Sequence, residues 1–367
     1  MEGAEEGIGP EELRSVVLRQ ARTLWGRPEK ARLVPPLMVW GPPGVGKSTI
    51  LRDAAAELGV GFVDVRLAQR EPVDVRGLPV PNREKGTVEW LVASDWPREG
   101  RGLLLFDELT AADRTLQVAA YELILDRRLG DLYRLPDGWY VCAAGNRVGD
   151  AAVATGMSSA LANRFLHVEL RADAQQWTRW ALAHGVHPAV VGFLRFRPDA
   201  LFRMEGEDLE RGWPSPRSWE RVGLLEEQFA GEDDDRVFRE LLRGLVGRAT
   251  AGEYLDFRRA AGSLPDVRAL MLDPSAPASF PDRADARCAY CAAATYWLWR
   301  AADDAEQDRL LAGFFRLSAA MPASYAAMLM TDAMAGPDGR NDPRWGERIA
   351  AHPGFAEWSR TAGGRRR

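Results

Sequence analysis

The chain has 367 residues, 46% of them hydrophobic and 28% charged, which is expected of a folded soluble protein with two or three domains. Its formal net charge of -5 weighs against a general nucleic-acid coat protein, which is usually basic. No apolar stretch reaches the ~20 residues needed to span a bilayer, and the three cysteines suit a reducing, cytoplasmic location.

The first 170 residues alternate between strand and helix patterns. The N-terminus is acidic and Gly-rich, so we expect no signal peptide there, and residues 11–25 have apolar positions at helical spacing. Strands are expected at 37–40, 61–67, 103–106, 140–144 and 165–170, with helices at 49–58 and about 113–127. Hairpins are expected at 78–92 and 128–135. Strands that alternate with helices predict an α/β fold with a parallel sheet.

From residue 171 onwards the pattern is helical and strand signals almost vanish. Residues 171–262 are expected to form one helical unit, the Pro-rich stretch 264–282 a linker or long loop, and residues 283–335 further helices. The helical stretch contains a C-x-x-C pair, Cys288 and Cys291. Because a zinc site would need two more ligands, we favour core packing for both cysteines over a metal or redox site.

The sequence GPPGVGKS at 41–48 fits the pattern G-x-x-x-x-G-K-[ST] between a strand and a helix, the context of a P-loop rather than an ordinary Gly-rich turn. Glycines let backbone N–H groups wrap around phosphates, and the helix N-terminus favours anions. Lys47 is expected to reach the β- and γ-phosphates of ATP, and the Ser48 hydroxyl to bind Mg²⁺. The predicted nucleotide-binding loop comprises Gly41, Pro42, Pro43, Gly44, Val45, Gly46, Lys47, Ser48 and Thr49.

Two carboxylates, Asp107 and Glu108, follow the apolar strand at 103–106. Because charge at the end of a buried strand is costly, their presence suggests a function. Asp107 is expected to hold Mg²⁺, and Glu108 to polarise a water for attack on the γ-phosphate. Asn146 follows the strand 140–144 and could orient that water or contact the γ-phosphate. The alternatives are that Glu108 begins a solvated loop and that Asn146 serves turn chemistry after Gly145.

This order of P-loop, acid pair, strand-terminal Asn and helical region resembles AAA+ ATPases. The hairpins match insertions of the clade that includes MoxR-type ATPases and the magnesium-chelatase motor subunit. The stretches LPVPNREKGTVEWLV, LLLFDE, RRLGDLYRLPDGWYVCAAGN and SSALANRF are most similar to the MoxR group. The resemblance covers about residues 13–225 and implies a parallel five-stranded αβα ATPase core at 1–170 and an α-helical lid at 171–262. The C-terminal helical extension, 263–367, has no counterpart in it.

The resemblance implies functional roles for two arginines. Arg164, in ALANRF, falls where the family carries an arginine finger for the neighbouring subunit's nucleotide; a cation at a helix C-terminus is also favourable without any such role. Arg217 falls at the family's sensor-2 position in the lid. Ser215 has the pattern of an N-cap, and a cation in the first helical turn needs compensation, which a γ-phosphate would supply. The alternative for Arg217 is an ordinary surface arginine.

The resemblance also implies ATP hydrolysis with Mg²⁺, a hexameric ring, a client protein that is remodelled or activated, and a partner with a von Willebrand factor A domain. Alternatives are an AAA+ motor acting on nucleic acid, which the acidic composition disfavours, a nucleotide-switched assembly module, and a small-molecule P-loop kinase. The four histidines show no metal-ligand spacing and are interpreted as structural or surface residues: His167, His184, His187 and His352.

Overall fold

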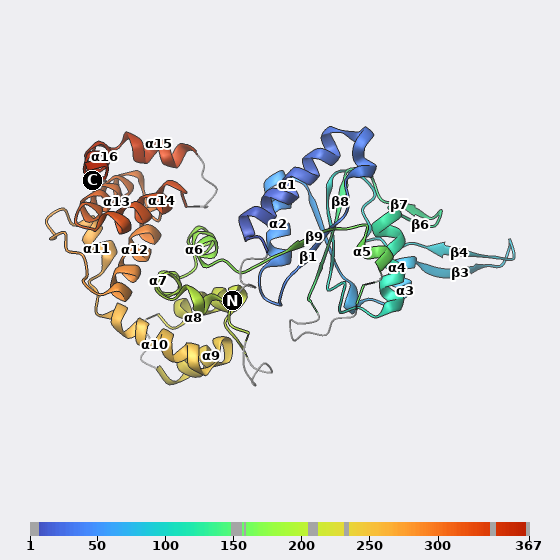
Figure 1. The fold of residues 1–367 in the computed structure, drawn as a ribbon, viewed down its shortest axis with the longest axis horizontal. Helices are drawn as coiled ribbons and strands as arrows, with labels where there is room; N and C mark the ends of the chain where they lie inside the picture. Colours follow the sequence, from blue (N-terminus) through green and yellow to red (C-terminus); the bar gives the residue numbers. More distant parts are fainter. Residues whose placement is uncertain are drawn as a thin grey trace. The chain divides into compact units, whose positions relative to one another are not determined.

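The computed structural model describes residues 7–147, 156–157, 159–204, 212–230, 235–337 and 343–364. Backbone contacts divide the chain into two compact units, Met1–Ala172 and Asp173–Arg367. The first unit is α/β and the second is helical (Figure 1). Within the described ranges, none of the helices combines the length and the apolar character that a bilayer crossing requires.

The first unit is built on a five-stranded parallel sheet with helices on both faces (Figure 1), which confirms the predicted fold class. The strands have the order β2-β5-β8-β1-β9. Their bounds are β1 Leu37–Trp40, β2 Gly61–Arg66, β5 Gly102–Asp107, β8 Trp139–Gly145 and β9 Leu166–Glu169. The helices are α1 Pro10–Gly26, η1 Pro28–Leu33, α2 Lys47–Leu58, η2 Leu67–Gln69, α3 Pro72–Arg76, α4 Arg114–Asp126 and α5 Ser159–Ala162.

Strand β5 shows why the sheet is buried on both faces. Its alternate residues point to opposite sides, so Leu103 and Leu105 join the core beneath α1 and α2, whereas Leu104 and Phe106 join the core beneath α4. A strand that is apolar on both faces is typical of a covered parallel sheet. This burial ends at Asp107, which is half-buried at the carboxyl end of the strand.

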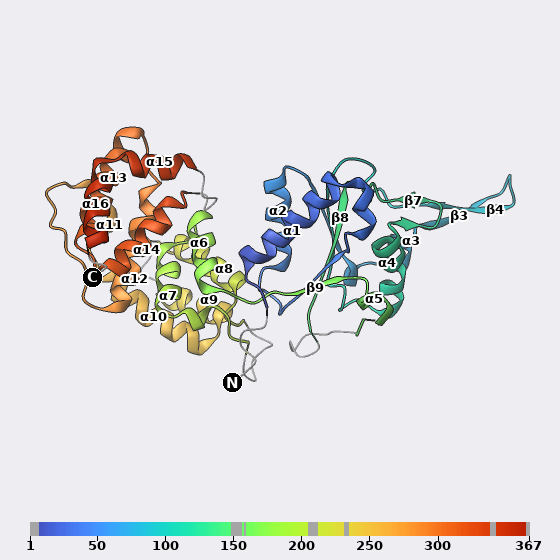
Figure 2. The ribbon, with the colours of Figure 1, turned by 45° about the horizontal axis from the view of Figure 1, so that its top comes forward.

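Both predicted hairpins are present in the first unit. The longer one comprises β3 (Leu78–Asn82) and β4 (Thr87–Leu91), and the shorter one comprises β6 (Arg128–Leu129) and β7 (Tyr133–Arg134). Figures 1 and 2 show the longer hairpin extending away from the body of its unit. Every residue of β4 is exposed, so this hairpin adds nothing to the hydrophobic core.

The second unit consists of helices. Their bounds are α6 Ala174–Ala183, α7 Pro188–Phe196, η3 Pro198–Leu201, α8 Pro216–Gln228, α9 Asp235–Val246, α10 Arg248–Gly262, α11 Val267–Leu272, α12 Ala284–Leu298, α13 Asp304–Ala319, α14 Ala323–Met334, α15 Pro343–Ala351 and α16 Pro353–Gly364. The stretch predicted as a linker therefore contains a short helix, α11. Its Val267 and Met271 are buried because α11 packs on α13.

Close packing joins the region predicted as a lid to the region predicted as an extension. Helix α7 lies against α12 so tightly that a Cβ on Gly192 would meet the Cα of Ala289 at 2.9 Å. Arg195 on α7 also pairs with Asp332 on α14 at 2.5 Å, and the two side chains are 8% and 5% exposed. Helices from both predicted regions therefore share one compact unit, in which Cys288 and Cys291 are both buried, as the core-packing interpretation expects.

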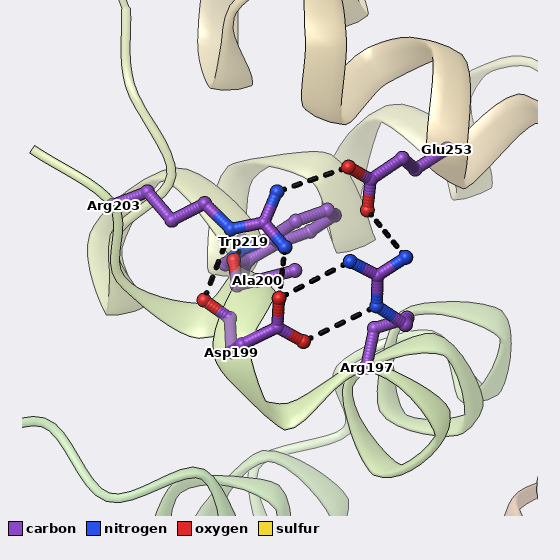
Figure 3. A network of polar contacts seen from close by, with 6 residues as sticks. All are labelled: Arg197, Asp199, Ala200, Arg203, Trp219 and Glu253. Carbon is purple, nitrogen blue, oxygen red and sulfur yellow. Dashed lines mark hydrogen bonds and ion pairs between the residues drawn. The ribbon is translucent and has the colours of Figure 1, made fainter. Parts of the chain in front are cut away.

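Four alternating charges close a ring in the second unit (Figure 3). Arg197 donates two hydrogen bonds to Asp199, at 3.2 and 3.1 Å, and Arg203 also pairs with Asp199. Glu253 on α10 accepts a hydrogen bond from Arg203 at 3.0 Å and forms an ion pair with Arg197 at 3.1 Å. The hydrogen bonds from Arg197 and Arg203 hold the pKa of Asp199 at about 2 although partial burial opposes them.

This depressed pKa predicts an acid-dependent loss of stability. A carboxylate whose pKa is about 2 in the folded state and ~3.9 in the unfolded state stabilises the fold fully above the unfolded value. The contribution then falls as the pH drops towards 2. Asp199→Asn should lower the urea midpoint at pH 6, and the difference from the parent should shrink at pH 3. An equal difference at both pH values would contradict the linkage.

Uncharged hydrogen bonds next to the charged ring fix the segment that leads into α8. The Arg203 N–H donates to Pro214 O at 3.1 Å, just before the helix, and Trp219 Nε1 donates to Ala200 O at 2.8 Å (Figure 3). Ser215 caps the helix by accepting from the Ser218 N–H at 3.2 Å, as its position in the sequence predicts. The first turn of α8, which contains Arg217, is therefore held by the Ser215 cap and by the bonds of Pro214 before it and Trp219 after it.

Candidate nucleotide site

The loop between β1 and α2 has the backbone of a phosphate-binding loop. Gly41, Gly44 and Gly46 have φ angles of 155°, 83° and 105°, values that residues with a side chain rarely adopt. A Cβ on Gly41 would also come within 2.9 Å of Leu170 O. Gly46 precedes α2 and provides no side-chain cap. The N–H groups of the first helical turn are therefore not occupied by a capping side chain and can bind an anion.

Oxygen ligands converge beside this loop. Ser48 Oγ, in the first turn of α2, donates to Asp107 Oδ2 at 2.5 Å. The other carboxylate oxygen, Asp107 Oδ1, accepts from the Glu108 N–H at 2.9 Å, which fixes the plane of the carboxylate. Carboxylate and hydroxyl oxygens are the hard ligands that Mg²⁺ prefers, so the two residues fit the predicted metal site.

Lys47 draws the P-loop and β8 together. Its ammonium donates to Gly41 O at 2.5 Å, Pro42 O at 3.1 Å and Asn146 Oδ1 at 3.0 Å. The side chain is largely buried, with the residue 9% exposed. Because β8 lies between β5 and β1, Asn146 just after it lies beside the P-loop and contacts Lys47. Within the described residues its side chain bonds Lys47 rather than Glu108.

Sequence reasoning missed the residue that holds Asn146. Thr110 Oγ1 accepts from the Asn146 N–H at 3.0 Å and donates to Asn146 O at 3.2 Å. The contact is close because Gly145 has no side chain: a Cβ there would lie 2.7 Å from Thr110 Oγ1. The only signal in the sequence is a threonine two residues after the acid pair, and its partner follows a strand that pairs with β5.

Thr110→Val tests this support. Valine keeps the shape of the buried side chain but removes both hydrogen bonds to Asn146, so turnover should fall about tenfold, the worth of one to two hydrogen bonds. ATP affinity should change less, because Lys47 and Ser48 stay in place. Steady-state turnover and equilibrium nucleotide binding measure the two effects. An equal loss in both would assign Thr110 a general structural role instead.

Glu108 has an unusual backbone for a residue with a long side chain. Its φ is 56°, in the left-handed region, a conformation that costs ~1–3 kcal/mol and is concentrated at functional sites. The following turn is anchored by Leu109 N–H donating to Ala144 O at 2.9 Å, which ties it to β8. The Glu108 side chain is exposed at the edge of the sheet beside Asp107, where a group that acts on water must lie.

A third carboxylate makes this edge more negative. Asp64, on β2 next to β5, has a pKa that is raised by burial and then by the nearby charges of Asp107 and Glu108. One of its oxygens, Oδ1, is buried without a hydrogen-bond partner among the described residues. Arg52 offsets this charge at 3.5 Å from the other oxygen. The excess of negative charge beside Ser48 favours a bound cation.

The two arginines with predicted roles are both exposed. Arg164 lies in the turn after α5, between Leu161 and Phe165, which are both buried in the core of the first unit. Arg217 lies in the first turn of α8, in the second unit. Among the described residues of the first unit, Arg164 is not part of the hydrogen-bonded group around Lys47 and Asp107, and Arg217 belongs to the other unit. The roles of both arginines therefore remain predictions.

Residues 37–116 match the family described as ATPase family associated with various cellular activities (AAA). The match spans the P-loop and the acid pair. Together with the site geometry, it assigns the first unit as a AAA-type ATPase domain, and the activity of the protein as ATP hydrolysis. No curated protein matches the chain.

The solved structures that match the chain have low sequence identities and low TM-scores. NtrX from Brucella abortus in complex with ADP is 17% identical, covering 96% of this chain and 68% of that one, with a TM-score of 0.37. The RuvB Holliday junction branch migration motor of Thermotoga maritima is 16% identical, covering 69% and 74%, with a TM-score of 0.34. Scores this low say nothing of what this protein binds.

Proposed function

We propose that this protein is a MoxR-like ring ATPase that uses ATP hydrolysis to remodel or activate a client protein. The supporting observation is the hydrogen-bonded group at the carboxyl edge of the sheet, in which Lys47 bonds Asn146 and Ser48 bonds Asp107. This group joins the P-loop, the acid-pair strand and the strand-terminal Asn. Two hairpins inserted at 78–91 and 128–134 support the MoxR-like assignment, since that clade carries insertions there.

The proposed roles follow from the chemistry of each side chain. Lys47 would neutralise the β- and γ-phosphates, and Ser48 and Asp107 would hold Mg²⁺, which supplies further charge neutralisation when bound. Glu108 would accept a proton from the attacking water, and Asn146 would orient that water or the γ-phosphate. Water rather than an organic acceptor suits a carboxylate that is exposed at the edge of the sheet, so we favour hydrolysis over phosphoryl transfer to a small molecule.

Arg164 suits a role in a neighbouring subunit's site. It is exposed between two buried anchors, so its side chain is presented on a firmly held turn of the first unit. Arg217, at the start of α8, would act from the lid. In this proposal ATP lies at subunit interfaces of a hexamer, and a partner with a von Willebrand factor A domain connects the ring to its client. The partner and client follow from the sequence resemblance.

The test of the ring is the solution mass of Glu108→Gln with and without Mg·ATP. Glutamine has nearly the same shape as glutamate but cannot accept the proton, so ATP should remain bound and unhydrolysed. A shift from small species to a six-subunit mass with trapped ATP is expected. A protein that binds ATP yet stays monomeric at micromolar concentration would overturn the autonomous ring, since Arg164 would have no neighbour to serve.

A second measurement separates a client-remodelling ATPase from a nucleic-acid motor. Turnover is measured with and without single- and double-stranded DNA and RNA, at low and moderate salt. The acidic composition leads us to expect no stimulation. Stimulation that falls steeply with added salt would favour the motor, because phosphate contacts release counterions on binding.

A further inference from the structure

We infer that His167 is a positioning residue for Arg164. It ties the turn that carries Arg164 to β1, the strand that leads into the P-loop. This inference rests on the proposed role of Arg164 as a finger for the neighbouring subunit. It goes beyond that role because it identifies how the turn that carries the arginine is held.

Both ring nitrogens of His167 are engaged. Nδ1 accepts a hydrogen bond from Trp40 Nε1 at 2.8 Å, and Nε2 lies 2.7 Å from Ala162 O. Because an indole N–H can only donate, Nδ1 must be unprotonated in this arrangement, and Nε2–H is then the donor to Ala162 O. The planes of the two rings are nearly parallel, with 15° between them and 5.9 Å between the ring centroids.

His167 thus bridges Trp40 and Ala162, and the Trp40 end of this bridge lies directly before the P-loop. Trp40 is the last residue of β1, and Gly41 follows it. His167 lies on β9, which pairs with β1 in parallel, with Met38 opposite His167. The tryptophan and histidine side chains therefore connect the carboxyl end of β1, which leads into the P-loop, with the second residue of the neighbouring strand β9.

The other end of the bridge holds the turn that carries Arg164. Helix α5 is a single turn, Ser159–Ala162, and a helix this short has no stability of its own. Leu161 and Phe165 bury their side chains, which fixes the depth of the turn. The His167 bond to Ala162 O adds a directional contact two residues from Arg164, and apolar packing alone does not supply such direction.

This geometry matters because an arginine finger acts only when its guanidinium is in place. A misplacement of about 1 Å can cost ~10²-fold in rate. Removing the bridge should therefore lower the activity of the site that Arg164 completes, without weakening ATP binding in its own subunit, where Lys47 and Ser48 are unchanged.

The experiment uses mixed rings of full-length subunits. Glu108→Gln subunits cannot hydrolyse ATP but have an intact Arg164, so they are finger donors. Arg164→Ala subunits lack the finger but have an intact nucleotide site, so they are site donors. Mixing the two should restore turnover that neither has alone. His167→Phe is then added to either type, and ATP turnover, ATP binding and ring mass are measured.

We expect His167→Phe to lower the turnover of the mixture by about 10- to 100-fold when finger donors carry it, and less than twofold when site donors carry it. His167→Gln, whose amide can still donate to Ala162 O, should restore much of the loss. If His167→Phe folds poorly, Trp40→Phe in finger donors is the second variant. It removes the donor to His167 Nδ1 and should act in the same direction. The matched control is His184→Phe, which alters a histidine stacked on Trp180 in the second unit and should change nothing.

Equal losses in both donor types, or a loss only with site donors, would assign His167 to the P-loop of its own subunit and overturn the inference. No loss in either would overturn it as well. A mixture that is inactive before His167 is changed would instead overturn the trans role of Arg164, and the inference with it, so the two failures are distinguishable.

Discussion

Arg164→Ala should lower ATP turnover by ~10³–10⁵ while ATP binding stays close to that of the parent protein, because a finger that stabilises transition-state charge is worth that much in phosphoryl transfer. The side chain is exposed and its removal leaves the buried Leu161 and Phe165 in place, so the fold should not suffer. Turnover is measured by phosphate release, and binding by equilibrium titration with a nucleotide.

Arg22→Ala is the matched control for this variant, since Arg22 is an exposed arginine on α1 of the same unit and has no proposed role. Its turnover should equal that of the parent protein. If Arg164→Ala behaves like Arg22→Ala, Arg164 has no part in hydrolysis and its position reflects only favourable charge near the end of a short helix.

Glu108→Gln should lower turnover by ~10²–10⁴, the usual contribution of a general base, without weakening the affinity for Mg·ATP. Asp107 and Ser48 keep their mutual bond at 2.5 Å, so the two proposed metal ligands are intact. The left-handed φ of 56° at Glu108 should be tolerated equally well, because glutamine places the same demand on the backbone. Single-turnover kinetics separate this chemical step from product release.

Asp107→Asn gives the contrasting result for that experiment. It removes the charge of a proposed metal ligand rather than the proposed base, so Mg²⁺ dependence should shift along with turnover. A Glu108→Gln protein that showed the same shift in Mg²⁺ dependence would place Glu108 among the metal ligands and leave the base unassigned. Glu29→Gln, on η1 and exposed, should behave as the parent does.

The motif residues could be predicted because each lies at the end of an element with a strong local signal. An apolar strand that runs into Asp107, and a strand that runs into GPPGVGKS, place both groups at one edge of a parallel sheet. The supporting contacts could not be predicted in this way. Thr110 bonds Asn146 across 36 residues, and Trp40 bonds His167 across 127 residues, so both depend on which strands are neighbours.

In the helical unit, the prediction of a linker or long loop at 264–282 was wrong in part. Prolines and charges around residues 264–282 predict a linker, yet α11 forms there because Val267 and Met271, one helical turn apart, are buried against α13. A Cβ on Gly313 would lie 2.1 Å from Met271 O, so the close approach depends on a glycine far along the chain. Six residues are too few for a periodic signal to outweigh the surrounding prolines.

The prolines of the hairpin β3–β4 disfavour edge-to-edge pairing along β3. Pro79 and Pro81 lie two residues apart on β3, opposite Trp90 and Val88, so the two prolines share one orientation in the ladder. Prolines are tolerated in a strand where the missing N–H would point outward. The outer edge of β3 then offers carbonyls without the donors that another strand needs for pairing. Copies of the protein can therefore expose this long hairpin at high concentration without joining it edge to edge along β3.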